Sequence, residues 1–273
     1  MKARLLLNVV LAVLATVLGV SLWLKPAPRP TVYALSSLDS AAVTQVRLQR
    51  PHQPSLVLDK VNGAWRVMSP FKARADALKI AHLLGLLSAT ADQRLPATNL
   101  GRFGLTTPTA RLTVNHQTFR FGVTNPLTQQ LYVATGDYVY LIAPQYAADV
   151  YSKLFDFSAK NLFGAGEEPI GFALPGLTLT RGKNGRWRVM PHRPHLTPDQ
   201  LNAWAEDWTQ ASALLSQPYV AGKRLEHITV HLASGKTITL AILQRQPEFI
   251  LLRQDENMQY DFPAASGKRL LNP

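Results

Sequence analysis

The sequence predicts an α+β protein in which an N-terminal transmembrane helix is followed by two repeated β-meander/helix/β-meander units with mainly antiparallel sheets. Three observations lead to this prediction: a seven-residue phrase that occurs twice, a long apolar run near the N-terminus, and many short segments that alternate apolar and polar residues. The phrase at 62–68 returns at 184–190, an offset of 122 residues (184 − 62), with six of seven positions identical. Each copy reads as a turn followed by a strand with a tryptophan, so the phrase indicates a structural unit that is used twice.

Composition and charge restrict the class of protein. A chain of 273 residues can form one or two domains with cores of their own. It contains no cysteine, which excludes disulfides, thiolate zinc sites and cysteine nucleophiles. Beyond residue 30 there are 25 basic residues (29 − 4) and 17 acidic ones, a formal excess of +8. We interpret this excess as a feature that makes the protein soluble and attracts it to an anionic membrane surface. No nucleic acid partner is expected, because the basic residues are scattered singly.

The apolar run Leu5–Leu24 has no charged residue, and its length matches a bilayer core of about 30 Å. We therefore interpret residues 1–24 as a membrane anchor. A cleaved secretory signal is the alternative, because Lys2 and Arg4 precede the run and Gly19-x-Ser21 resembles a cleavage site. A short basic tail before an apolar segment is typical of export. The expected location is thus the bacterial inner membrane, with the N-terminus cytoplasmic and the bulk of the chain periplasmic.

Residues 25–39 are expected to form a Pro-rich, semi-rigid spacer, and 40–165 the first repeat unit. Alternation predicts a three-strand meander with a hairpin turn at Asn62-Gly63, and helical spacing predicts a helix that begins at Asp76 and ends near Ser88. A second helix is expected over 144–157. Pairs of alternating apolar residues predict the strands of this unit: Val46 and Leu48, Leu56 and Leu58, Trp65 and Val67, Leu112 and Val114, Phe119 and Phe121, Leu131 and Val133, Val139 and Leu141.

Residues 166–273 are expected to form the second unit in the same order. Strands at Leu177 and at Trp187 precede Thr197-Pro198-Asp199-Gln200, a sequence typical of a capped helix start. The apolar stripe of that helix is predicted at Leu201, Trp204, Trp208 and Leu215. Further strands are expected at 228–232, 237–243, 249–253 and 258–262.

Four tryptophans are predicted to belong to the structural core: Trp65, Trp187, Trp204 and Trp208. In the repeated phrase, alternation points Trp65 and Trp187 to the same face as the valine two residues later. Exposed tryptophans can also bind sugars or bases, which is the functional alternative. Arg66 and Arg188 point to the opposite face and are the residues we expect on an interaction surface.

Several short motifs of the first unit resemble those of an uncharacterised bacterial domain-of-unknown-function family. They are Trp65, Pro70, Ala75-Asp76, Phe103-Gly104-Leu105 with Pro108, Phe121-Gly122, Leu131-Tyr132-Val133 and Val139-Tyr140-Leu141. The resemblance covers residues 40–160 and extends to the second half only through the repeat. The second unit lacks a counterpart of Phe103-Gly104-Leu105. Members are typically membrane-anchored, and some are encoded beside gliding-type ABC transporter genes. The resemblance thus implies a place outside the membrane and an accessory role in a membrane complex, and it supplies no catalytic residues.

No motif in the sequence indicates a chemical reaction, a cofactor or a metal. His192 and His195 lie in a Pro-rich loop without a third ligand, while His227 and His231 are about 13 Å apart on an expected strand. Three adjacent acidic pairs are interpreted as solvated surface or linker charges: Glu167-Glu168, Glu206-Asp207 and Asp255-Glu256. No Gly-x-Ser-x-Gly elbow, phosphate loop or dinucleotide turn is present.

Three functional hypotheses follow. The first is a non-enzymatic, single-pass membrane protein whose periplasmic part binds or scaffolds other envelope or inner-membrane proteins, as an accessory subunit of a membrane or transporter complex. The second is an envelope glycan or peptide hydrolase or transferase with its site between the two units. The third is an adaptor for a lipid or polysaccharide, for which exposure of Trp204 or Trp208 would be the sign. The sequence identifies no small-molecule ligand.

Overall fold

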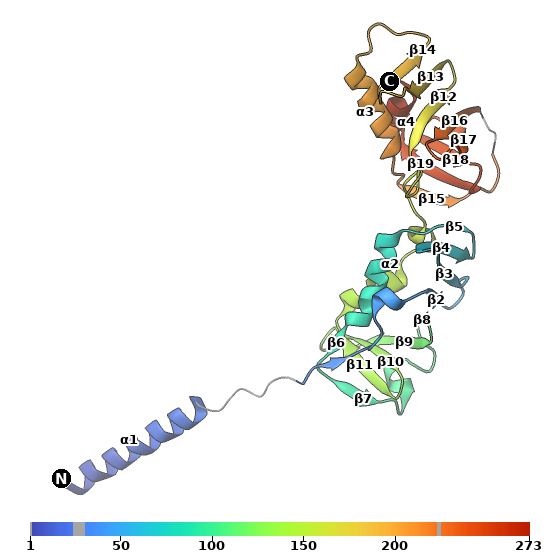
Figure 1. Cartoon of the computed structure of the whole chain (residues 1–273). Coiled ribbons are helices and arrows are strands. Elements are labelled where there is room, and N and C mark those ends of the chain that lie inside the picture. The colour runs from blue at the N-terminus through green and yellow to red at the C-terminus, as the bar shows by residue number, and fades with distance from the viewer. Residues whose placement is uncertain (1, 24–30, 223–224) are drawn as a thin grey trace.

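The computed structural model describes residues 2–23, 31–222 and 225–273, and it is an α+β fold with mainly antiparallel sheets. Figure 1 shows helix α1 at one end, a first unit built on one sheet, and a second unit on the side of the first that faces away from α1. The chain passes once from the first unit to the second, between Phe157 and Pro169.

Helix α1 comprises Lys2–Trp23, and the apolar side chains that are described in it, from Val10 to Val20, are exposed. Within the described part of the chain, no helix has both the length and the apolar character that crossing a bilayer requires. The expectation of a transmembrane helix at Leu5–Leu24 is therefore not confirmed. Residues 24–30, which include most of the proline-rich part of the expected spacer, lie outside the described residues.

Among the described residues, the first large sheet has nine strands in the order β5-β4-β3-β2-β8-β9-β10-β11-β7, all antiparallel to their neighbours. A small sheet pairs β1 (Tyr33–Ala34) with β6 (Thr90–Ala91). The strands of the large sheet are β2 (Gln45–Gln49), β3 (Leu56–Val61), β4 (Ala64–Ser69), β5 (Ala73–Arg74), β7 (Arg94–Pro96), β8 (Ala110–Val114), β9 (Gln117–Thr124), β10 (Leu131–Thr135) and β11 (Tyr138–Ile142).

Helix α2 (Ala77–Leu84) begins where the sequence predicts, because the Asp76 carboxylate accepts a hydrogen bond from the Lys79 N–H at 3.0 Å. It continues as the 3-10 helix η2 (Gly85–Ser88), so the predicted end near Ser88 is also confirmed. Other 3-10 segments in this unit are η1 (Ser40–Ala42), η3 (Leu100–Phe103), η4 (Pro144–Tyr151) and η5 (Leu154–Phe157).

In the part of the second unit that the structure describes, eight antiparallel strands follow the order β14-β13-β12-β16-β17-β18-β19-β15. Helix α3 (Pro198–Thr209) has the predicted capping box, in which the Gln200 N–H donates to Thr197 Oγ1 and the Thr197 N–H to Gln200 Oε1. A final helix is α4 (Ala264–Leu271). The strands are β12 (Pro169–Leu174), β13 (Leu177–Arg181), β14 (Trp187–Met190), β15 (Leu215–Pro218), β16 (Glu226–Leu232), β17 (Thr237–Gln244), β18 (Glu248–Arg253) and β19 (Met258–Pro263).

The two large sheets have corresponding strand orders. If β5 is set aside, β4-β3-β2-β8-β9-β10-β11-β7 matches β14-β13-β12-β16-β17-β18-β19-β15 position by position. The helix after the first meander, α2 or α3, also occupies the same place in the chain order. In both units the repeated phrase forms the end of a hairpin and the following strand, β4 or β14.

The expected helix over 144–157 is wrong as a single element. Two 3-10 segments, η4 and η5, replace it, because Ser152 and Lys153 adopt extended backbone between them and the Asp156 side chain caps the start of the second. Leu215 is also wrongly placed, because α3 ends at Thr209 and Leu215 begins β15. The strand at Trp187 is present as β14, whereas β12, β15, α4 and the strands of two or three residues were not predicted from the sequence.

Candidate functional site at the junction of the two units

Arg74 extends from the first unit into the second. It lies on β5, which folds back against β4 so that Arg66 is paired with Arg74 and Val67 with Ala73. Its guanidinium donates to Glu256 Oε1 at 2.5 Å and to Tyr260 Oη at 2.9 Å. It also donates to the carbonyl oxygens of Asn161 at 2.8 Å and Leu162 at 3.1 Å. One arginine of the first unit is thus bonded to β19 and to the loop before it.

Arg253, at the end of β18, is the second charged centre of the junction, and only 2% of its side chain is exposed. It donates to both carboxylate oxygens of Glu167, at 2.5 and 2.7 Å, and to both of Asp255 at 3.0 Å. A further bond to the Leu162 carbonyl oxygen measures 2.8 Å. Such two-pronged contacts are among the strongest hydrogen bonds that a buried guanidinium can form. We call Arg74, Arg253, Glu167, Asp255, Glu256 and Tyr260 the junction cluster.

The charges of the junction cluster stabilise one another. Burial acts to raise the pKa of Glu167, but the hydrogen bonds from Arg253 and from the Gly164 N–H outweigh burial and lower this pKa to about 2. Burial also raises the pKa of Tyr260, whose neutral hydroxyl donates to Glu256 Oε2 at 2.7 Å. For Arg253 burial acts to lower the pKa, yet its bonds to Glu167 and Asp255 raise it above the ordinary value. At neutral pH the cluster therefore holds paired ions and a protonated tyrosine.

The segment that connects the units is bonded to both of them. The Ala159 N–H donates to the Arg74 carbonyl oxygen at 2.8 Å, on the side of the first unit. On the other side, the Leu162 N–H donates to the Ala211 carbonyl oxygen and the Ala213 N–H to the Lys160 carbonyl oxygen, each at 2.9 Å. Backbone hydrogen bonds and the junction cluster therefore both link the two units.

Two hollows flank Arg74 at the junction. The larger has a volume of ≈600 Å³ and is lined by Trp65, Asp76 and Glu167, among other residues. The smaller has a volume of ≈250 Å³ and is lined by Arg66, Lys72 and Asp255 together with other members of the junction cluster. In the larger hollow the Asp76 carboxylate caps α2 and Glu167 is paired with Arg253, so both acids already have partners.

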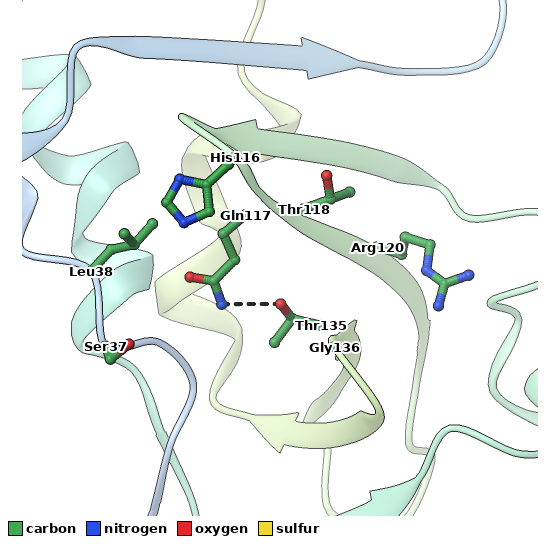
Figure 2. A pocket seen from close by; sticks show the side chains of 8 residues that line it. All are labelled: Ser37, Leu38, His116, Gln117, Thr118, Arg120, Thr135 and Gly136. Atoms are coloured by element: carbon green, nitrogen blue, oxygen red, sulfur yellow. Dashed lines mark hydrogen bonds between the residues drawn. The ribbon is translucent and has the colours of Figure 1, made fainter.

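Two further hollows lie on the first unit, away from the junction. Figure 2 shows the polar one, of ≈520 Å³, in which Gln117 extends to Thr135; its amide donates to Thr135 Oγ1 at 3.1 Å and accepts from Ser36 Oγ at 2.6 Å. The other, of ≈740 Å³, is mainly apolar and is lined by Val123, Leu131 and Tyr151, among others. In the polar hollow the central side chain is thus already hydrogen-bonded.

The structure separates the two arginines that the sequence singles out. Arg66 is exposed on β4 and lines both junction hollows. Arg188 is exposed on β14, at the opposite edge of the second sheet from β15, and Figure 1 places that strand at the end of the molecule away from the junction. They therefore do not form one surface.

The four tryptophans differ in burial. Trp204 and Trp208 are buried on α3, whereas Trp65 and Trp187 are half-buried and pack at the margin of the core. Phe172 lies at the centre of the aromatic group in the second unit, with its ring centroid 5.3–5.7 Å from those of Trp187, Trp204 and Trp208. The exposure of Trp204 or Trp208 that would favour a sugar or lipid adaptor is absent.

The junction cluster was not predicted from the sequence, and the interpretation of Glu167 and Glu256 as solvated surface or linker charges is wrong. Glu167 and Glu256 are not free surface charges, because they bind Arg253 and Arg74; the neighbouring Glu168 is 61% exposed. One signal was available. Arg253 occupies an alternate position of its strand with Phe249 and Leu251, so period-two alternation points its charge to the core, where a charge needs a partner.

The histidines do not converge in the structure. His227 and His231 are exposed on β16, and His192 and His195 are exposed after β14. Among the described residues, no group of three or more His, Cys, Asp or Glu side chains is placed to hold a metal ion.

Comparison with known proteins identifies the family. The model of the family described as "Domain of unknown function (DUF4340)" matches residues 65–217, which is more than half of the 273-residue chain. No curated protein and no solved structure matches the chain. The matched region begins at Trp65, crosses the junction and ends in β15, so it includes both copies of the Trp-Arg-Val-Met phrase. The chain therefore belongs to the DUF4340 family, a family of domains of unknown function.

Proposed function

We propose that this protein is a non-enzymatic binding or scaffold module for other proteins of the bacterial envelope, as an accessory subunit of a membrane complex. The observation that carries the proposal is the junction cluster. Its charged groups bind one another across the two units, from Arg74 on β5 to Glu256 beside β19. A pair of units fixed in this way presents surfaces at a constant spacing, which is what a scaffold requires and what limits the entropy lost when a partner binds.

We also propose a location at the inner membrane, with the bulk of the chain on the periplasmic side. Two features support it: the formal excess of +8 beyond residue 30 (25 − 17), which favours an anionic surface, and the exposed apolar side chains of α1. A protease-protection assay on closed inner-membrane vesicles would test this proposal. Protease that reaches only the cytoplasmic face of the vesicles is expected to leave the chain intact, and protease that also reaches the periplasmic face is expected to digest it. Digestion from the cytoplasmic face alone contradicts the proposal.

We infer in addition that the two units arose by internal duplication. The corresponding strand orders and the repeated phrase support this inference. Superposition of the eight corresponding strands should bring Trp65 onto Trp187 with every strand running in the same direction. A superposition in which corresponding strands run in opposite directions would rule it out.

The scaffold proposal can be tested by copurification. The full chain, tagged and expressed in a bacterium, is cross-linked in cells, extracted in mild detergent, and its partners are identified by mass spectrometry. We expect a reproducible partner set that the R74Q/E256Q variant recovers several-fold less well, because loosening the junction removes the fixed spacing. The matched control is Glu168→Gln, an exposed charge outside the junction cluster. Recovery of the wild-type chain only as a monomer, under several detergents, contradicts the proposal.

A second candidate function is that of an envelope glycan or peptide hydrolase or transferase. The observation that favours it is the hollow of ≈600 Å³ between the units, because enzyme sites often lie at such junctions. Its weakness is chemical: Glu167 has a pKa of about 2, far from the value that suits a general acid or base at neutral pH. Release of soluble fragments from purified cell-wall glycan or peptide by the wild-type chain, but not by Asp76→Asn, would favour this candidate over the scaffold.

A further inference from the structure

The two units differ at one edge of their sheets. In the first unit β4 is covered by the chain itself, because β5 pairs with it and the Ala75 N–H donates to the Trp65 carbonyl oxygen at 3.1 Å. In the second unit the equivalent strand, β14, is the last of its sheet and pairs only with β13 among the described residues. After Met190 the chain goes on to α3 without adding a strand. The position that β5 fills in the first unit is open in the second.

The backbone groups of Trp187 and Val189 face this open edge. The Gly182 N–H donates to the Arg186 carbonyl oxygen at 2.9 Å, so in the alternating antiparallel ladder Arg188 and Met190 bond inward to β13 and the residues between them point outward. Trp65, the counterpart of Trp187, shows the same orientation because its carbonyl oxygen accepts from Ala75. Within the described structure, no backbone or side-chain hydrogen bond reaches the outer side of Trp187 or Val189. An unpaired row of this kind is a template for a further strand.

The surroundings of this edge are strongly basic. No Asp or Glu occurs from 181 to 198. Within the described residues, Arg181 forms an ion pair with Glu168 at 2.7 Å, and no other Arg, Lys or His of 181–198 forms one. Cations so close together create a positive potential that favours an acidic partner. The basic residues and histidines of this stretch are Arg181, Lys183, Arg186, Arg188, His192, Arg193 and His195.

We propose that the β14 edge binds an extended acidic segment of a partner protein as an added β-strand. The first unit shows which side chains such a strand would carry. A residue opposite Val189 takes the place that the buried Ala73 has beside Val67, so it is small or apolar. A residue opposite Arg188 takes the place that Arg74 has beside Arg66, on the face of the sheet opposite to that of Val189, where an acid would meet the arginine. The fitting segment therefore alternates Asp or Glu with small apolar residues.

The test uses fluorescent seven-residue peptides and the full chain in mild detergent. One peptide alternates glutamate with valine, and a second has lysine in place of glutamate. A third is the acidic peptide with N-methyl groups on its valine nitrogens, which are the ones that would face β14. We expect the acidic peptide to bind, and the lysine peptide to bind at least about tenfold more weakly because of the basic surroundings. N-methylation should also weaken binding about tenfold or more, because it removes the N–H groups that pair with the edge.

Two protein variants and one exchange measurement complete the test. Arg188→Glu should weaken the acidic peptide about tenfold, whereas Arg269→Glu, an exposed arginine on α4, should change its binding less than about twofold. On binding, the amide hydrogens of Trp187 and Val189 in the wild-type chain should exchange more slowly. Absence of binding by the acidic peptide, equal binding by the N-methylated peptide, or unchanged exchange at these two residues overturns the inference.

This inference rests on the proposed binding function, yet the two can fail separately. Cellular partners that copurify equally well with wild type and with Arg188→Glu would remove the β14 edge as their binding site and leave the scaffold proposal standing. A chain that binds the acidic peptide through β14 but recovers no partner from cells would instead remove the scaffold proposal and leave the edge as a peptide-binding site.

Discussion

Single residues at the junction show how a buried charge is made tolerable in this protein. Arg253 is 2% exposed, and such a position would be costly without the Glu167 and Asp255 carboxylates and the Leu162 carbonyl oxygen that surround it. Asp255 follows Arg253 by two residues, but Leu162 and Glu167 lie 91 and 86 residues before it, so no local motif indicates these two partners. Alternation in the sequence predicts only that the charge of Arg253 lies at a core position.

Glu167→Gln is predicted to reduce the free energy of unfolding by roughly 2 kcal/mol at pH 7, because it weakens both bonds to a buried guanidinium. The folded-state pKa of Glu167, about 2, lies below the ordinary 4.5. Its stabilisation is thus fully present above pH 4.5 and is lost as the pH falls towards 2. Denaturant unfolding of wild type and variant over this range should show their difference shrinking.

The adjacent Glu168→Gln is the control for that measurement. Glu168 is 61% exposed and pairs with an exposed arginine, Arg181, so its replacement should cost less than about 0.5 kcal/mol. Equal effects of the two substitutions would mean that Glu167 contributes no more than a surface ion pair.

At the scale of elements, the structure explains two motifs that the family resemblance used. Phe103-Gly104-Leu105, at the end of η3, packs directly on Phe121-Gly122 in β9. A Cβ atom at Gly122 would lie 2.1 Å from the Phe103 carbonyl oxygen and 3.1 Å from Leu105. Glycine is thus needed where η3 crosses the strand. The described part of the second unit has no 3-10 helix between α3 and β16, which accounts for the missing counterpart there.

Gly122→Ala should therefore destabilise the fold by roughly 2–3 kcal/mol, since the new methyl group meets backbone that can move only together with η3. Gly85→Ala is the matched control. No atom lies within 4 Å of a Cβ at Gly85, whose φ is −54°, so this substitution should be neutral or stabilise by about 0.5 kcal/mol. Thermal unfolding followed by circular dichroism measures both, and a Gly122→Ala protein as stable as wild type would contradict the close packing.

Elements with strong local signals were predictable from the sequence. The Asn62-Gly63 turn is present, with both residues at positive φ (51° and 80°), because this dipeptide suits a two-residue hairpin. The cap of α3 at Thr197 is likewise confirmed. The two-residue strand β5 carries too few positions for alternation to reveal it, and it forms because the longer neighbouring strand β4 offers hydrogen bonds. The junction depends on β5, so the site was less predictable than the sheets.

At the scale of the whole molecule, strong polar contacts join the two units. The cluster around Arg74 and Arg253 joins them, and the backbone of the connecting segment pairs with Arg74 on one side and with Ala211 and Ala213 on the other. If the spacing of the two units matters for function, loss of Arg74 should let this spacing vary while each sheet stays folded. The connecting segment would then open more often to solvent.

Trypsin can report this opening, because Lys160 lies within the connecting segment and its carbonyl oxygen is bonded to the Ala213 N–H. In Arg74→Met, cleavage after Lys160 should be about tenfold faster than in wild type, as expected when about 1.4 kcal/mol of local stability is lost. Cleavage after Lys236, in an exposed turn of the second unit, should be unchanged and serves as the internal control. Equal acceleration at both sites would indicate general unfolding, and no acceleration at Lys160 would mean that Arg74 does not hold the units together.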